Sequence, residues 1–206
     1  SQDKIKKRIT YITVEFLAVA FNNILYFASV YPKSIFESRK KYNVVVFKSV
    51  HPQVNQYLDM CLKSIEACIK NNKLKRLEFV ITDENYKALL SFIFDFDIQN
   101  QHETTDTYFI KSEQNFRAFC LKLSTMIHIF QKLPENTSFT IYLHTNECTA
   151  ISLATNPEVE DFPMIEVENE SKKSDGIVPI RSFDVGQYSM STYVEINELD
   201  ISYSIL

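Results

Sequence analysis

The first thirty residues carry apolar side chains at helical spacing, and they do so on more than one face. One apolar stripe runs along the helix, and Leu17, Phe21 and Leu25 add apolar side chains on its other faces. Because a helix that is apolar on most sides must be buried on most sides, we expect the rest of the chain to wrap around this segment up to Pro32. The main stripe consists of Ile5, Ile9, Ile12, Phe16, Val19, Asn23, Phe27 and Val30.

The same segment imitates two targeting signals. A basic start, an apolar run and the sequence A-V-A ending at Ala20 follow the order of a secretory signal peptide. Glu15 interrupts the apolar run, however, and the helical pattern continues past Ala20 without a break. Asn22 and Asn23 would also be unfavourable in lipid. We therefore expect a core helix, with no membrane partner and no secretion.

Alternating and helical patterns follow over the next hundred residues. Residues 43–50 form a β-branched run typical of a strand, and Pro52 suits the first position of a helix that ends near Asn72. Two alternating runs, 77–81 and 90–98, predict a hairpin. A third helix is expected over 106–133 and another strand over 138–145. By pattern alone, Tyr57 is a core residue of the 52–72 helix.

The chain changes character after Glu147. Residues 158–175 hold seven acidic residues against two lysines, with little periodicity, and a patterned run returns at 190–196. The acidic run by itself is typical of a solvated loop. Long irregular segments in compact domains are often functional or disordered. We expect one domain over 1–206, with a core over 1–146 and an arm over 147–206 that carries the mechanism.

The composition excludes the common catalytic loops. The only glycines are Gly176 and Gly186, so nothing before them can form a phosphate-binding loop, a dinucleotide fingerprint or a nucleophile elbow. Asp95 and Asp97 alternate with phenylalanines, which places both carboxylates on the solvent face of a strand rather than in an acid–base pair. The four histidines show no ligand spacing. We expect no catalysis, no cofactor and no metal; a hydrolase built from scattered histidines and aspartates is the remaining enzymatic hypothesis.

A basic triplet, Arg39–Lys41, invites a nucleic-acid hypothesis. The net charge of the chain is −4, whereas a nonspecific duplex binder neutralises roughly 6–10 phosphates. Three cations do not supply that, so we expect no strong direct DNA binding. The triplet is interpreted as a solvated connector, with Tyr42 as a packing residue.

Two of the four cysteines, Cys61 and Cys68, lie seven positions apart on a predicted helix. That spacing separates them by about 10 Å along the helix axis, which is too far for a disulfide or for one zinc ion. We expect the cysteines to be buried, reduced thiols.

Several blocks of the sequence resemble the HORMA domain family. Residues 15–44 (EFLAVAFNNILYFASVYPKSIFESRKKYNV) and 51–58 (HPQVNQYL) are similar to the branch that serves as accessory subunit of translesion DNA polymerase zeta. The resemblance implies an α+β fold, in which an antiparallel sheet packs against three helices and ends in a C-terminal safety-belt segment. Shorter matches extend it over nearly the whole chain: 117–124 (RAFCLKLS), 139–145 (FTIYLHT), 161–163 (DFP), 178–180 (VPI) and 193–195 (YVE).

The resemblance implies a non-catalytic adaptor. In this family the belt closes over an extended, proline-containing peptide of the catalytic subunit, which pairs with an edge strand; here that edge would be 139–145. Tyr57 matches the pocket tyrosine that packs on the peptide. Met164 stands where the family usually has a tryptophan, which suggests a looser motif preference. The implied peptide-binding residues are Tyr57, Phe139, Ile141, Leu143 and Met164.

Two further surfaces are implied by the resemblance. The first receives the C-terminal domain of the partner polymerase Rev-one: Tyr193 matches the family there, Ile177 replaces a leucine and Ser191 replaces a glutamine. The second is a self-association face for HORMA homodimers or heterodimers on the third helix. Arg117 matches its arginine, and Ser29 stands where a glutamate is usual.

The resemblance also implies a nuclear location, and it leaves open an AAA+ remodeller that opens the belt. The alternative hypothesis within the family is a spindle-checkpoint or meiotic adaptor that uses the same clamp on a different closure peptide.

Overall fold

The computed structural model describes residues 1–98, 106–146, 151–153, 165–166, 176–186 and 188–197. Its helices are α1 (Gln2–Phe27), the 3₁₀ turn η1 (Lys33–Ile35), α2 (Pro52–Lys70), α3 (Asp106–Ser124) and α4 (Ile127–Phe130). Its strands are β1 (Phe36–Lys41), β2 (Val44–Ser49), β3 (Leu74–Thr82), β4 (Ala88–Ile98), β5 (Ser138–Thr145), β6 (Ile151–Leu153), β7 (Ile165–Glu166), β8 (Gly176–Asp184) and β9 (Tyr188–Ile196).

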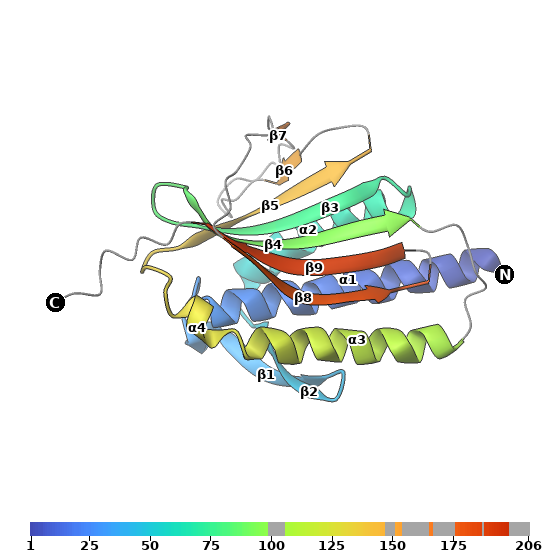
Figure 1. Cartoon of the computed structure of the whole chain (residues 1–206), viewed down its shortest axis with the longest axis horizontal. Helices are drawn as coiled ribbons and strands as arrows, with labels where there is room; N and C mark the ends of the chain where they lie inside the picture. The colour runs from blue at the N-terminus through green and yellow to red at the C-terminus, as the bar shows by residue number, and fades with distance from the viewer. Residues whose placement is uncertain (99–105, 147–150, 154–164, 167–175, 187, 198–206) are drawn as a thin grey trace.

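Seven of the described strands form one antiparallel sheet in the order β7-β6-β5-β3-β4-β9-β8, and β1 pairs with β2 in a separate hairpin. The long helices α1 and α2 pack on one face of the large sheet, and α3 runs beside α1 and β8 (Figure 1). This is the predicted α+β fold. The predicted strands at 77–81, 90–98, 138–145 and 190–196 are confirmed within β3, β4, β5 and β9, and Pro52 begins α2 as expected.

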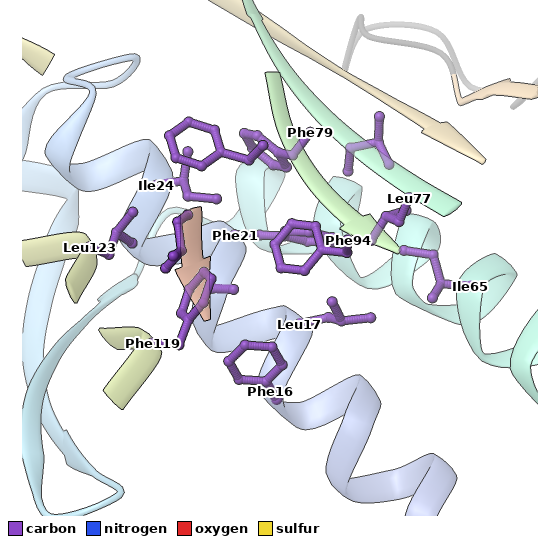
Figure 2. Close-up of a cluster of buried hydrophobic side chains, with 14 of the residues drawn as sticks. Phe16, Leu17, Phe21, Ile24, Ile65, Leu77, Phe79, Phe94, Phe119 and Leu123 are labelled. Atoms are coloured by element: carbon purple, nitrogen blue, oxygen red, sulfur yellow. The ribbon is translucent and has the colours of Figure 1, made fainter. Parts of the chain in front are cut away.

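Helix α1 lies at the centre of the core, as its all-round apolar pattern predicts. The Phe16 ring stacks on Phe116 of α3 with centroids 4.3 Å apart, and it meets Phe94 of β4 and Phe183 of β8 edge-on. One turn later, Phe21 packs against Phe79 of β3 at 5.0 Å. Figure 2 shows Phe16, Phe21, Phe79 and Phe94 among the side chains that converge between α1 and the sheet. A single helix therefore joins four other elements, α3, β3, β4 and β8, into one core.

The two asparagines of α1 hold the β1–β2 hairpin. The side-chain oxygen of Asn22 accepts a hydrogen bond from the backbone N–H of Ser49 (2.9 Å), and that of Asn23 accepts one from Phe47 (3.1 Å). Among the described helices, α1 is the one long and apolar enough to cross a membrane, yet 61% of its most apolar window is buried inside the protein. Its asparagines thus serve a packing contact, consistent with a core helix.

The basic stretch before Tyr42 is a strand, and the prediction of a connector there was wrong. Arg39 and Lys40 lie in β1, opposite Val46 and Val45 of β2, and both basic side chains are exposed. The turn between the strands is Tyr42-Asn43, with φ of 52° and 60°. Two consecutive left-handed residues form the tight turn that matches strand twist. Tyr42 itself is buried, with its ring 5.4 Å from Phe116, so its predicted packing role is confirmed.

The third helix is shorter than predicted. It ends at Ser124, and a separate turn of helix, α4, follows at Ile127. The hydroxyls of Ser124 and Thr125 donate to the carbonyls three residues back, Leu121 and Lys122, both at 2.7 Å. Such local bonds compete with continued helix. Ile127, at the start of the turn of helix that follows the break, is 56% exposed.

Candidate functional site

Strand β5 offers its backbone, not its side chains, to a binding partner. Phe139, Ile141 and Leu143 point into the core and are 3%, 0% and 0% exposed. Phe139 stacks on Phe79 of β3, with centroids 5.0 Å apart. An incoming strand beside β5 would therefore meet its N–H and C=O groups. The structure places the three predicted residues on the predicted strand. Their side chains hold β5 against the core and do not face a partner.

The prediction that β5 is the edge of the sheet was wrong. Strand β6 lies outside it, with Ile151, Ser152 and Leu153 opposite Leu143, Tyr142 and Ile141, and β7 lies outside β6. Among the described strands, β6 covers only three of the eight residues of β5. The chain folds back after β5 and occupies part of the edge that a partner strand would need.

Tyr57 lies beneath β5, on the buried face of α2. Its ring meets Phe139 edge-on at 5.4 Å, and the residue is 4% exposed. Burial raises the pKa of Tyr57, and the neighbouring thiol of Cys61, to which it is hydrogen-bonded, raises it further. Tyr57 thus couples α2 to the strand that would receive a partner. Met164, the other predicted pocket residue, lies outside the described residues, as do most of the arm and nearly all of its acidic run.

Strands β8 and β9 bring three predicted surface residues together. Ser191 and Tyr193 alternate with the buried residues of β9 and therefore lie on the sheet face opposite the helices. Ile177 of β8 is paired with Glu195 on the same face and is 58% exposed. A large exposed apolar side chain beside a half-buried tyrosine is typical of a protein-binding surface.

An ion pair between Arg76 and Asp95, which the sequence pattern does not reveal, lies beside Tyr193. Arg76 of β3 holds Asp95 of β4 through two contacts, Nε to Oδ1 at 2.6 Å and Nη2 to Oδ2 at 3.3 Å. The hydroxyl of Tyr193 donates to Asp95 Oδ2 at 3.0 Å and accepts from Arg76 Nη2 at 3.3 Å. Asp95 lies on the solvent face, as predicted, but it fixes the orientation of Tyr193. The alternation of the sequence predicts that Asp95 lies on the solvent face of its strand. Its partners Arg76 and Tyr193 are found only from the register of the strands.

This contact predicts an alkaline pH dependence. Burial, and then the charge of Asp95, raises the pKa of Tyr193 from 10.0 to about 12. The folded protein then keeps a proton that the unfolded chain releases, so the contribution is fully present below about pH 10 and is lost as pH rises towards about 12. Urea unfolding at about pH 9 and about pH 11 should show a larger loss of stability for the native protein than for Tyr193→Phe. Equal losses would contradict the assigned contact.

The predicted self-association face lies on the exposed side of α3. Arg117 is exposed, and two large apolar residues on the same stripe, Ile110 and Leu121, are 61% and 47% exposed. Positions seven and four residues apart fall on one face of a helix. Ser29, the other residue assigned to this face, is an exposed residue just after α1 with a φ of 53°. No negative charge is available at that position to pair with an arginine.

Metal and thiol chemistry find little support in the described part of the chain. No group of three or more His, Cys, Asp or Glu side chains there could hold a metal ion. Cys61 and Cys120 are buried free thiols, as predicted, whereas Cys68 is only half-buried. Burial raises the pKa of both buried thiols to about 12, which suppresses the reactive thiolate form.

The sequence matches the HORMA domain family over residues 10–175. It is 30% identical over 187 residues to the "Mitotic spindle assembly checkpoint protein MAD2B" of Homo sapiens, covering 89% of each chain. It is also 27% identical over 166 residues to the "DNA polymerase zeta subunit 2" of Drosophila melanogaster, covering 80% of this chain and 84% of the relative.

Solved structures show the same fold at lower identity. A chain of the "Crystal Structure of Mitotic Checkpoint Complex" superposes with a TM-score of 0.76 at 18% identity, covering 92% of this chain and 98% of the other. The "Structure of C. elegans HTP-2 bound to HIM-3 closure motif" gives a TM-score of 0.68 at 14% identity, covering 93% of this chain and 91% of the other.

Proposed function

This chain belongs to the HORMA domain family, and from that premise we propose that it is a non-catalytic adaptor subunit of DNA polymerase zeta. It would hold a proline-containing segment of the catalytic subunit beside β5, under its C-terminal arm. The name of the Drosophila relative supports the polymerase, and the HTP-2 structure, solved with a bound closure motif, supports peptide capture as a use of this fold. The observation that carries the proposal is that β7 and β8, the described strands before and after residues 167–175, lie at opposite edges of the sheet.

The arm joins opposite edges of the sheet. It leaves one edge at β7, which ends at Glu166, and returns at the other edge with β8, which begins at Gly176. Six inter-strand steps of roughly 4.8 Å separate those edges, about 29 Å in all. The nine intervening residues reach roughly 30 Å when extended, so there is little slack.

We infer that the peptide adds to the sheet at β5. In strand addition, main-chain hydrogen bonds provide the affinity and side-chain pockets provide the sequence specificity. Only Ile141–Leu143 of β5 are paired with β6, so a longer partner strand gains more hydrogen bonds than it displaces. Because release would require the belt to move, the captured peptide should dissociate slowly.

Tyr57 provides the first test. We expect Tyr57→Ala to weaken binding of a proline-containing peptide from the catalytic subunit by about 1–3 kcal/mol, because the buried Tyr57 ring supports the position of β5 through Phe139. Isothermal titration calorimetry of the intact protein measures this change. The matched control is Lys63→Ala on the exposed side of the same helix, which should bind like the native protein.

Circular dichroism of each variant must show that the fold is retained. Two results would count against the proposal: native affinity in Tyr57→Ala, or no binding by the intact native protein.

We further propose that the β8–β9 face receives the C-terminal domain of Rev-one, that the α3 face mediates HORMA pairing, and that the protein acts in the nucleus, where an AAA+ remodeller opens the belt. The alternative is a spindle-checkpoint or meiotic adaptor, which the name of the human relative favours. Purification of the tagged protein from its own cells, followed by mass spectrometry, separates the two. Polymerase subunits support the first function, and checkpoint or chromosome-axis proteins support the second.

A further inference from the structure

Helix α3 turns one stripe of side chains to solvent. Its other side is buried in the core, where Phe116, Phe119 and Leu123 are 1%, 0% and 0% exposed. Ile110 and Leu121, by contrast, are 61% and 47% exposed. They lie about 16.5 Å apart along the helix axis, close to three full turns, and therefore on one face. The stripe thus has a large apolar side chain near each of its ends.

Two opposite charges lie between those ends. Glu113 and Arg117 are both exposed, and neither forms an ion pair with another residue in the described part of the chain. On a helix of about 3.6 residues per turn, they are displaced by about 70° and about 30° from the line through Ile110 and Leu121. Both displacements are to the same side. The middle of the stripe therefore carries one acid and one base along one side.

This order of side chains is self-complementary when two copies of α3 pack antiparallel about a two-fold axis. An axis through the midpoint between Ile110 and Leu121 brings each of them next to the other residue in the second copy. Glu113 and Arg117 lie on either side of the same midpoint, at nearly equal distances from it. Because such an axis keeps residues from one side of the stripe together, Glu113 comes next to Arg117 of the second copy, twice in each dimer.

Other arrangements of the two helices fit the charges less well. Parallel packing in register would bring Arg117 next to Arg117 of the second copy and Glu113 next to Glu113, and like charges across an interface repel each other. An antiparallel pairing centred on Arg117 would also bring the two arginines together. The charge pattern therefore favours a second copy of this chain, antiparallel and centred between Glu113 and Arg117.

We propose that Glu113 supplies the acidic partner of Arg117 in a symmetric, antiparallel α3–α3 homodimer. Glu113 would thereby take the role that the resemblance gives to a glutamate at the position of Ser29, which carries no charge. Ile110 and Leu121 would cover each other at the two ends of the contact. This inference rests on the pairing proposed above for the α3 face, and it adds the orientation, the symmetry and the charge partner.

Charge reversal tests the contact. One helix face per copy makes a small interface, so the dimer should be weak. Analytical ultracentrifugation of the intact protein over a concentration series measures its dissociation constant. Glu113→Arg and Arg117→Glu should each raise that constant by roughly tenfold or more, because each replaces two attractive contacts by two repulsive ones. Glu84→Arg, an equal change of charge in the β3–β4 turn, is the matched control and should dimerise like the native protein.

Mixing the two charge variants is the sharper test. In a mixed dimer, every contact between positions 113 and 117 joins an arginine of one variant to a glutamate of the other. Glu113→Arg and Arg117→Glu should therefore form a heterodimer at a concentration at which each alone is monomeric. The double variant Glu113→Arg/Arg117→Glu should dimerise like the native protein. Loss of folding in either single variant could not produce this rescue.

A further variant separates the charge contact from the pairing on which it rests. Leu121→Asp changes an exposed end of the stripe and tests whether α3 is the contact face at all. Dimers weakened by Leu121→Asp but not by either charge variant, or variants that fail to rescue each other, would overturn the role of Glu113 and leave pairing through α3 standing. A native protein that stays monomeric, or dimers that Leu121→Asp does not weaken, would overturn the pairing itself and this inference with it.

Discussion

Replacing Phe16 by alanine is expected to lower the free energy of unfolding by about 3–5 kcal/mol. The ring is fully buried and contacts Phe116, Phe119 and Phe183 as well as Phe94. Its loss would open a cavity where α1, α3, β4 and β8 meet, and partial collapse would not refill it. A loss of this size is a large share of the total stability of a domain.

Urea unfolding followed by far-ultraviolet circular dichroism measures this loss, since the chain has no tryptophan to report by fluorescence. Tyr11→Ala on the same helix is the matched control, because Tyr11 is 65% exposed and surface changes stay within about 0.5 kcal/mol. If Phe16→Ala cost no more than Tyr11→Ala, α1 would not be the centre of the core.

Locking β6 to β5 is expected to abolish peptide capture. Tyr142 and Ser152 are direct partners in the two strands, and antiparallel partners have Cα atoms roughly 4.5–5.5 Å apart, within disulfide range. In Tyr142→Cys/Ser152→Cys, oxidation would hold β6 in place, so the peptide would lose several backbone hydrogen bonds. We expect affinity to fall by roughly 100-fold or more and to return on reduction.

The lock needs two controls. Cys68 and Cys148 are replaced by serine in every variant, to avoid wrong pairings. Lys40→Cys/Val45→Cys, at partner positions of the β1–β2 hairpin, carries a disulfide away from the sheet and should bind the peptide in both redox states. Equal affinity of the oxidised and reduced β5–β6 variant would mean that the peptide does not take the place of β6.

Periodicity was enough to predict the central helix and four strands of the sheet, β3, β4, β5 and β9, because each buries one continuous apolar set. The β1 strand was missed for the opposite reason. Its residues Arg39 and Lys40 are exposed on a hairpin that leaves most of β1 in solvent, so no alternation marks it. Its turn, Tyr42-Asn43, also lacks the glycine that usually signals a tight hairpin. Similarly, the end of α3 depends on side-chain bonds of Ser124 and Thr125 that no apolar pattern reveals.

The candidate site was predicted in part. The resemblance assigned Ser191 and Tyr193 to one surface, and the structure places both on the same face of β9. The sequence alone does not reveal that Arg76 and Asp95 lie beside Tyr193. Asp95 and Tyr193 are 98 residues apart and meet only through the register of β4 with β9. Nor could the sequence show that β6 covers β5, because three residues carry too little pattern to predict a strand.

Hydrogen exchange at β5 tests the central claim most directly. The intact native protein is compared with and without a saturating proline-containing peptide from the polymerase catalytic subunit. We predict that exchange of the backbone amides over 138–145 slows by roughly tenfold or more, while the β1–β2 hairpin is unchanged. A peptide that binds without slowing exchange at β5, or that does not bind at all, would contradict the account.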